Sequence, residues 1–497
     1  METKTDALTE LRERLRTVAD LDRAAAVLGW DQEVNMPPGG LRARASQLST
    51  LARLAHEHFT APELGEVLAS AEAATAQLPY ESDERSLVRV TRRDYEQATR
   101  LPVALVAELA EVSTSARPVW LKARAENDWA SFAPVFANNV RLHREVADAL
   151  GWKERRYDAL INSTEPGLTT AALEGLFEEL KAVAVPLVAE VADRDASDHV
   201  LFADVPPERQ VSFAYETCIA LGFDPQRGRQ DLSAHPFCSI FSVGDVRLTT
   251  RTTTGFANTL YSSIHEIGHG LYDQGVDPAL DGTRLDDGAT AGFHESQSRL
   301  WENLVGRSRA FAEWLVPRLR RDLPAQYADV DADSWYKALN LVRPTFIRVD
   351  ADELTYNLHI LLRFELENLL IDGDLAAADV PEAWNARMRE YLGVEPPTDT
   401  DGALQDIHWS GLGFGSFPSY TLGNVIGAQL MEVIRRQLPD LDDQIARGEF
   451  EPLLDWLRTN VYRHGRKLTP SELLVRITGE DLNARAWIDY ARRKFSA

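Results

Sequence analysis

Cysteine is scarce in this chain of 497 residues, which contains only two, Cys218 and Cys238. Two cysteines are too few for a disulfide framework, and neither stands in a Cys-x-x-Cys pair. No run of eighteen apolar residues is present that could cross a membrane. The start of the chain leads straight into an amphipathic pattern and lacks the charged and apolar regions of a secretion signal. We therefore expect a soluble protein in a reducing compartment, the cytoplasm.

Basic residues are outnumbered by acidic ones: the chain has 53 Lys and Arg and 77 Asp and Glu, which gives a formal charge of −24. A polyanion would be repelled, and no basic patch of convincing length is present, so we expect no nucleic acid and no membrane as partner. The hydrophobic content of 44% suffices for a large core. Length alone suggests about three domains. We expect instead a single domain over 1–497, with a helical part at roughly 1–230 and a second part at 231–497.

Most of the chain has a helical pattern. Leu11, Leu15 and Val18 follow helical spacing near the start, and the segments that come after are divided by prolines. We expect Pro102, Pro118 and Pro134 to lie at or near helix ends, because proline disrupts a helix interior. No internal repeat or segment of low complexity is present. The fold class predicted is mostly α.

The sequence His-Glu-Ile-Gly-His at 265 to 269 places two imidazoles four residues apart, on one face of a helix. Apolar residues at 260, 264, 267 and 271 lie on the opposite face, which leaves the histidines facing a cleft. Neutral imidazole is a good zinc ligand, and Glu266 can reach a water held in an open coordination position. Because eleven histidines make a chance match rare, this pattern indicates a zinc hydrolase.

The third metal ligand must come from another segment, because Tyr272 and Gly275 stand where a metzincin has glycine and histidine. A helix over 292–304 would carry Glu295 and Arg299 on its polar face. Glu295 would complete a set of two histidines and one carboxylate, which leaves a fourth position for water. Arg299 could then orient Glu295 or pair with Glu302. The alternative is an exposed pair of Glu295 with Arg299, with His294 as the ligand.

The sequence pattern changes at 238–254, where apolar and polar residues alternate as in a β-strand. We expect a small β-sheet beside the zinc helix. Asp245, Arg247 and Thr249 share one face of such a strand, so a polar row would border the cleft and contact substrate. The alternative is a solvated strand face that an Asp245 to Arg247 ion pair stabilises. An exposed strand edge would suit an extended peptide, which could add itself as a further strand.

Several motifs occur in an order that resembles the carboxypeptidase Taq family of zinc metallocarboxypeptidases. They are Trp30-Asp31-Gln32 and Met36-Pro37, His-Pro-Phe at 235 to 237, Asp-Val-Arg-Leu-Thr at 245 to 249, His-Glu-Ile-Gly-His at 265 to 269, His-Glu-Ser-Gln-Ser-Arg at 294 to 299, Ile-Arg-Val-Asp-Ala-Asp at 347 to 352 and Gly-Ala-Leu-Gln-Asp-Ile-His-Trp at 402 to 409. The resemblance covers essentially the whole chain. It implies a mostly helical, two-lobed body with a deep groove, similar to neurolysin, and a homodimer that releases C-terminal residues with broad specificity.

The resemblance also implies roles for single residues. His265, His269 and Glu295 match the metal ligands, and Glu266 matches the general base. Arg348 matches a docking group for the terminal carboxylate of the substrate, a task that suits a guanidinium because its planar fork holds a carboxylate with two hydrogen bonds. The alternative for Arg348 is an ion pair with Asp352, four residues along a helix.

His408 and Tyr420 match the residues that stabilise the oxyanion in related helical peptidases, since each can donate a hydrogen bond where negative charge develops. The residues at 411–420 lack the Gly-Lys-Ser/Thr ending of a phosphate loop, and we interpret them as a mobile loop at the cleft. The family usually has an aromatic residue where Ser416 stands, so a contact made by that ring is in doubt here.

The function that we predict is a metallocarboxypeptidase with one zinc ion per chain, or cobalt in its place, that acts on peptides with a free C-terminus. A metal-bound water activated by Glu266 is the expected nucleophile. The alternatives are an endopeptidase or dipeptidase with the same metal set, and a non-enzymatic scaffold with a structural zinc. An aminopeptidase is disfavoured, because no Gly-Ala-Met-Glu-Asn type of motif is present to bind a free amine.

Overall fold

The computed structural model of the chain describes residues 2–192, 197–253, 255–411 and 413–496. Two compact units are formed, each from three stretches of chain. The first comprises Met1–Thr99, Ser197–Leu339 and Leu430–Glu480, and the second Arg100–Ala196, Asn340–Gln429 and Asp481–Ala497. The division suggested near residue 230 falls inside the first unit. Within the described ranges, no helix combines the length and the apolar character that a membrane crossing needs.

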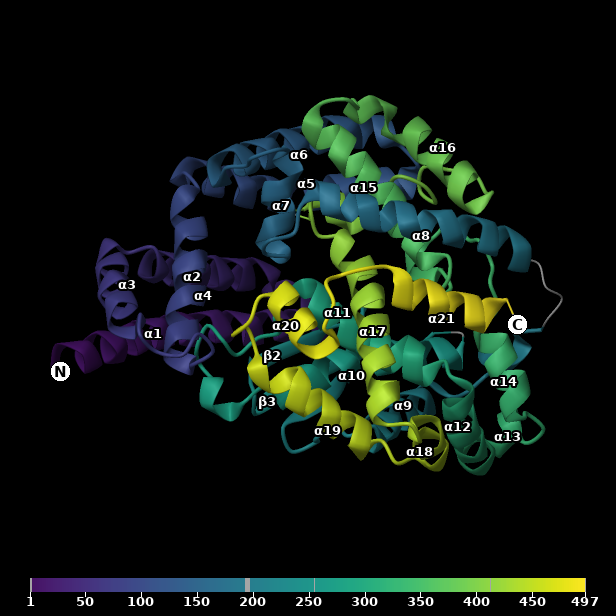
Figure 1. Ribbon diagram of the computed structural model, residues 1–497. Helices are drawn as coiled ribbons and strands as arrows, with labels where there is room; N and C mark the ends of the chain where they lie inside the picture. The colour runs from purple at the N-terminus through teal and green to yellow at the C-terminus, as the bar shows by residue number, and fades with distance from the viewer. Residues whose placement is uncertain (1, 193–196, 254, 412, 497) are drawn as a thin grey trace. The chain divides into compact units, whose positions relative to one another are not determined.

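The first unit contains helices around one small sheet (Figure 1). Its elements are α1 (Glu2–Val34), α2 (Leu41–Phe59), α3 (Pro62–Thr75), α4 (Asp83–Arg100), α9 (Pro207–Ala220), β1 (Gly228–Leu232), β2 (Cys238–Ser242), β3 (Asp245–Thr250), α10 (Phe256–Gly275), α11 (Ala291–Arg299), the π-helix η4 (Leu300–Gly306), α12 (Arg309–Asp322), α13 (Pro324–Tyr327), α14 (Ala332–Leu339), α18 (Leu441–Arg447), α19 (Glu451–Asn460) and α20 (Pro470–Thr478), with short 3-10 turns at Pro38–Gly40, His199–Phe202, Pro278–Leu280 and Tyr462–His464.

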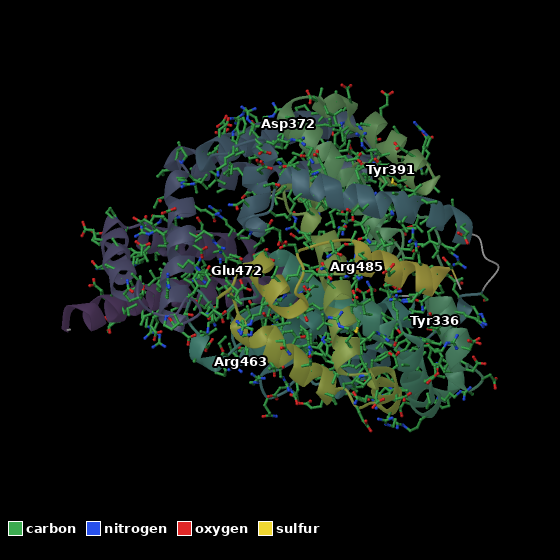
Figure 2. The ribbon with its side chains drawn as sticks, in the orientation of Figure 1. Tyr336, Asp372, Tyr391, Arg463, Glu472 and Arg485 are labelled. Carbon is green, nitrogen blue, oxygen red and sulfur yellow. The ribbon has the colours of Figure 1, made fainter. Side chains whose placement is uncertain are left out.

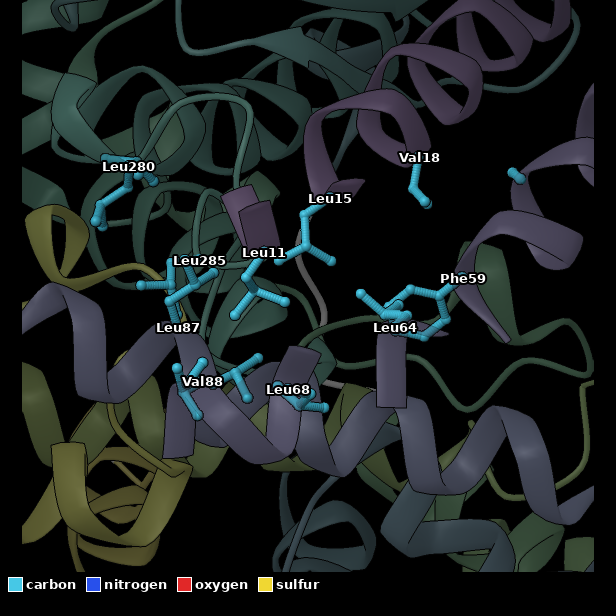
Figure 3. Packing of buried hydrophobic residues seen from close by; sticks show 14 of the residues in the cluster. Leu11, Leu15, Val18, Phe59, Leu64, Leu68, Leu87, Val88, Leu280 and Leu285 are labelled. Atoms are coloured by element: carbon cyan, nitrogen blue, oxygen red, sulfur yellow. The ribbon is translucent and has the colours of Figure 1, made fainter. Parts of the chain in front are cut away.

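One apolar cluster of the first unit joins the start of the chain to its middle (Figure 3). Leu11, Leu15 and Val18 of α1 are buried, as the helical spacing predicted. They pack with the leucines of α3 and α4 and with Leu280 and Leu285, which follow α10. This packing connects the N-terminal helices to the segment that carries the histidine motif.

The three strands have the order β1-β3-β2, with β1 parallel and β2 antiparallel to β3. Helix α10 packs against β2 and β3, which confirms the small sheet beside this helix. Since β3 is paired on both sides, a free edge for a peptide would have to come from β1 or β2. Thr254, the last residue of the predicted strand region, lies outside the described residues.

The second unit is helical. Its elements are α5 (Val103–Glu126), α6 (Trp129–Leu150), α7 (Arg156–Thr164), α8 (Thr170–Val191), α15 (Tyr356–Asp372), α16 (Val380–Leu392), the first part of α17 (Pro418–Gln437) and α21 (Arg485–Phe495), with 3-10 turns at Arg348–Asp350, Ala377–Asp379 and Ile407–Ser410. Polar contacts join elements of this unit. Tyr391 of α16 donates to Glu365 of α15 at 2.7 Å, and Asp372 at the end of α15 accepts from Arg155 at 2.7 Å (Figure 2).

The mostly α fold is thus confirmed, but two of the proline predictions are wrong. Pro102 does cap α5, whereas Pro118 and Pro134 lie inside α5 and α6. A proline inside a helix removes one backbone hydrogen bond and costs about 3 kcal/mol. In α6 the burial of Phe132 and Phe136 on either side of Pro134 offsets that cost.

Candidate active site

Three candidate metal ligands come together in the first unit. The Nε2 atoms of His265 and His269, both on α10, lie 3.9 and 3.6 Å from Oε2 of Glu295 on α11. Ligand atoms around a tetrahedral zinc ion lie about 3.3 Å from one another, given zinc-to-ligand distances of about 2.0 to 2.1 Å. Both distances are close to this value, and ligand atoms of all three residues lie within 4.8 Å of one another, so the group could hold a zinc-sized cation after small shifts.

The local sequence explains why α10 and α11 can place these ligands so close together. Leu260, Ile264, Ile267 and Leu271 are buried, so the histidines occupy the other face of α10 as predicted. Between the histidines stands Gly268, where a Cβ atom would lie 2.4 Å from the Cα of Ser298 in α11. Only glycine permits this close approach of the two helix backbones.

Glu266 lies beside the candidate metal ligands in a poorly hydrated position. The residue is 7% exposed. Burial raises the pKa of Glu266 to about 7, partly offset by His265. A carboxylate with a raised pKa is a stronger base than an exposed one, which suits a group that must take a proton from water near neutral pH.

His265 and Glu295 are held by a network that includes Arg299 and Glu302. The Nδ1 atom of His265 lies 2.9 Å from Oε2 of Glu302, so a proton there can be donated to the carboxylate. Arg299 donates to Oε1 of Glu295 at 2.7 Å and to Oε2 of Glu302 at 3.3 Å. Arg299 thus holds Glu295 and also pairs with Glu302, the two roles that the sequence suggested for it. The hydrogen bond from His265 to Glu302 was not foreseen; it fixes the ring and leaves Nε2 to bind a metal.

His294, the alternative ligand, is engaged elsewhere. Its Nδ1 atom lies 2.6 Å from Nδ1 of His269, and its Nε2 atom lies 2.9 Å from Oδ1 of Asp273. Burial lowers the pKa of His294, but Asp273 outweighs this and raises it to about 9. The structure therefore places the carboxylate of Glu295, and not the ring of His294, with the two Nε2 atoms.

Arg348 lies in the second unit and is 6% exposed. Its guanidinium donates to Oδ1 of Asp406 through Nε at 3.1 Å and a terminal nitrogen at 2.8 Å. Arg363, fully buried, donates to the other oxygen of Asp406 at 2.6 Å. The predicted alternative partner, Asp352, is wrong: its carboxylate accepts from the backbone N–H groups of residues 343, 354 and 355. Two guanidiniums and one carboxylate leave this cluster with one net positive charge.

His408 and Tyr420, the candidate oxyanion donors, lie together in the second unit. The Nε2 atom of His408 is 3.2 Å from the hydroxyl of Tyr420. Burial lowers the pKa of His408 to about 4, with a smaller contribution from Arg348 and Arg363 and against the opposing effect of Asp406. The imidazole is therefore neutral at pH 7, and its one ring N–H can donate a hydrogen bond to an oxyanion.

The loop between His408 and Tyr420 is tied to a buried glutamate. Glu367 of α15 accepts hydrogen bonds from the hydroxyl of Tyr157 at 2.6 Å, the indole of Trp409 at 2.9 Å and the backbone of Gly415 at 2.9 Å. In the same loop the Ser416 side chain donates to the carbonyl of residue 413. Leu412 lies outside the described residues. The bond to Gly415 ties the loop at 411–420, which we interpreted as mobile, to Glu367 of α15.

We expect Glu367→Gln to change how stability depends on pH. Burial raises the pKa of Glu367 from 4.5 to about 7, so the folded protein holds a proton that the unfolded chain releases. This preference stabilises the parent below pH 4.5 and is lost as pH rises to 7, a difference of about 3 kcal/mol. Urea unfolding at pH 5 and pH 8 should show a smaller loss of stability in the variant than in the parent. Equal losses would contradict the prediction.

Asp245 and Arg247, the candidate substrate contacts on β3, pair with each other. The guanidinium donates to both carboxylate oxygens at 2.9 and 2.8 Å and lies over the rings of Trp30 and Phe241. This is the ion pair that the sequence analysis gave as the alternative, and a role in substrate binding stays a prediction. Thr249 in the same row is buried and bonds to the backbone of residue 237.

Comparison with known proteins agrees with this geometry. The family model described as carboxypeptidase Taq (M32) metallopeptidase matches residues 10–495. A thermostable carboxypeptidase 1 from Thermus thermophilus is 40% identical over 99% of this chain and 98% of the relative, and a carboxypeptidase 1 from Bacillus subtilis is 35% identical over 98% and 97%. The crystal structure of an M32 carboxypeptidase from Deinococcus radiodurans matches with a TM-score of 0.95 and 41% identity, over 99% of each chain.

Proposed function

Because the chain belongs to the carboxypeptidase Taq (M32) family of metallopeptidases, and so is a peptide hydrolase, we propose that it uses zinc to release C-terminal residues with broad specificity. The observation that carries this proposal is the convergence of His265 Nε2, His269 Nε2 and Glu295 Oε2 beside the buried Glu266. Three protein ligands leave a fourth position open, as in catalytic zinc sites and unlike closed structural ones.

In this proposal the candidate site residues divide the chemistry among them. When bound, zinc supplies a Lewis acid that polarises the scissile carbonyl and acidifies a water molecule. Glu266 accepts a proton from the attacking water and then delivers it to the leaving amine. His408 and Tyr420 donate hydrogen bonds to the oxyanion that forms on the carbonyl oxygen. Cobalt could replace zinc, since the same imidazole and carboxylate ligands bind both ions.

Recognition of the substrate terminus falls to Arg348 in this proposal. Its cluster with Asp406 and Arg363 keeps one net positive charge, which a terminal carboxylate would neutralise. We further propose that Asp245 and Arg247 contact the peptide through the exposed side of their ion pair. The homodimer, the deep groove and the cytoplasmic location that the resemblance and composition implied stay predictions.

Timed digestion of one unblocked peptide, with an amidated copy beside it, tests the proposal. We expect a ladder shortened only from the C-terminus, and very slow cleavage of the amidated copy, because the amide carries no charge for Arg348 to bind. Mass spectrometry of the products gives the order of release. The control is the same protein after dialysis against a chelator, which should be inactive and regain activity with zinc. Internal cleavage of both peptides at equal rates would indicate an endopeptidase instead.

A further inference from the structure

The two candidate histidine ligands are supported in different ways. His265 Nδ1 faces a carboxylate directly, that of Glu302 at 2.9 Å. His269 Nδ1 instead faces another imidazole, that of His294 at 2.6 Å, and only the far side of that second ring meets a carboxylate, Asp273 at 2.9 Å. His269 is thus connected to Asp273 through His294.

The protons along this chain of contacts can be assigned from the ligand role of His269. Its Nε2 atom faces Glu295, so in the metal-bound state that nitrogen needs its lone pair and the ring proton must lie on Nδ1. Only one proton fits between the two Nδ1 atoms. Once a metal occupies Nε2 of His269, Nδ1 of His294 therefore accepts, and the second proton that its raised pKa gives this ring in the metal-free protein is released. The proton of His294 then lies on Nε2 and is donated to Oδ1 of Asp273. The opposite arrangement would put a proton on Nε2 of His269 and prevent ligation.

The surroundings hold His294 and Asp273 in this arrangement. Asp273 is 2% exposed, and its second oxygen lies 3.7 Å from the thiol sulfur of Cys238 on β2. A Cβ atom at residue 288 would lie 2.6 Å from the imidazole carbon Cδ2 of His294, so the backbone of this loop lies against the ring. The ring of His294 also lies against those of Tyr272 and His269, with centroids 5.1 and 4.8 Å apart. A carboxylate this well buried needs the bond to His294, and the imidazole has little freedom to turn.

We propose that Asp273 and His294 are positioning residues that keep the proton of His269 on Nδ1 and thereby make its Nε2 atom a metal ligand. This inference rests on the metal site of the proposed function. Asp273 lies four residues after His269 on α10, so one helix face carries both metal-binding histidines and the carboxylate that orients the second of them. The site would then depend on a residue that never touches the ion.

An alternative use of the same residues is a second cation held by Asp273, Asp287 and His294, whose ligand atoms lie within 4.8 Å of one another. Binding through Nε2 of His294 would move its proton to Nδ1. That proton would be donated to Nδ1 of His269 and force the wrong tautomer on the metal ligand. The two ions therefore compete, and one ion per chain is the expected stoichiometry.

Zinc affinity measured by competition with a chromophoric chelator tests the proposal, with zinc alone as the ligand. Asp273→Asn should weaken zinc binding about 10- to 100-fold, as loss of a partner behind a metal ligand does. The matched control is Asp287→Asn, a nearby exposed aspartate, which should stay within about threefold of the parent. If Asp273 acts through His294, the double variant Asp273→Asn with His294→Ala should bind zinc no more weakly than His294→Ala alone.

A purely structural role would make the two losses add, and additive losses would overturn the proposal. The proposal would also be overturned if Asp273→Asn bound zinc with parental affinity, or if the parent bound two zinc ions per chain. Where a variant does not fold, ¹⁵N-histidine NMR of the zinc-loaded parent decides instead, since a proton on Nδ1 of His294 would contradict the assignment. The proposed function fails separately, if the parent binds no zinc or if Glu295→Ala binds it equally well.

Discussion

Glu266→Gln is expected to bind zinc as tightly as the parent and to hydrolyse peptides about 10²- to 10⁴-fold more slowly. The amide has nearly the same shape as the carboxylate, so the packing around this 7% exposed side chain should survive. What is lost is the ability to accept a proton from the attacking water and to return it to the amine. The loss should therefore appear in kcat with little change in KM.

The measurement combines steady-state kinetics on an unblocked peptide with metal analysis of each purified protein. Glu216→Gln is the control, because it makes the same change at an exposed position of α9 in the same unit. It should leave both activity and zinc content unchanged. Near-parental turnover by Glu266→Gln would show that another group takes the proton, and loss of zinc would show that Glu266 supports the ion instead.

The candidate metal site was largely predictable from the sequence because its spacing is local. Two histidines four residues apart share a helix face in any α-helix, and the apolar residues on the opposite face were expected to be buried. The same spacing extends to Asp273, four residues after His269, so this carboxylate could have been found from the pattern. Its link through His294 could not, because that contact depends on how α10 and α11 cross at Gly268.

Glu295 shows the limit of local reasoning. The helical pattern placed it on a polar face with Arg299 and Glu302, and the structure confirms that the three side chains interact. Nothing in the spacing decided between Glu295 and His294, since either could have turned toward α10. The resemblance to a known family favoured Glu295. The physical reason is that Asp273 and His269 already bind both nitrogens of His294.

Partners from distant segments were the least predictable. A local rule offered Asp352 to Arg348 because the two are four residues apart. The chain does not continue as a helix there: a 3-10 turn at Arg348–Asp350 is followed by Asp352, whose carboxylate accepts from backbone N–H groups just before α15. The true partner, Asp406, lies 58 residues away. Only the tertiary fold brings these charges together.

Arg348→Ala should lower kcat/KM on peptides with a free C-terminus by about 30- to 4,000-fold. A terminal carboxylate that is desolvated without its cation costs about 2 to 5 kcal/mol, which corresponds to that range. The variant should fold, because Asp406 keeps its bond from Arg363 at 2.6 Å and is not left unpaired. The net charge of the cluster falls from +1 to zero, and with it the attraction for a carboxylate.

Two comparisons isolate this effect. Amidated peptides carry no terminal charge, so the parent should cleave them very slowly and Arg348→Ala should change that rate little. Arg155→Ala, which removes an arginine paired with Asp372 at the surface of the same unit, should keep parental activity on both peptides. Since a long substrate uses its remote contacts for positioning, part of the loss should appear in kcat as well as in KM. Parental activity of Arg348→Ala on free-acid peptides would reduce Arg348 to a structural partner of Asp406, and terminal recognition would need another cation.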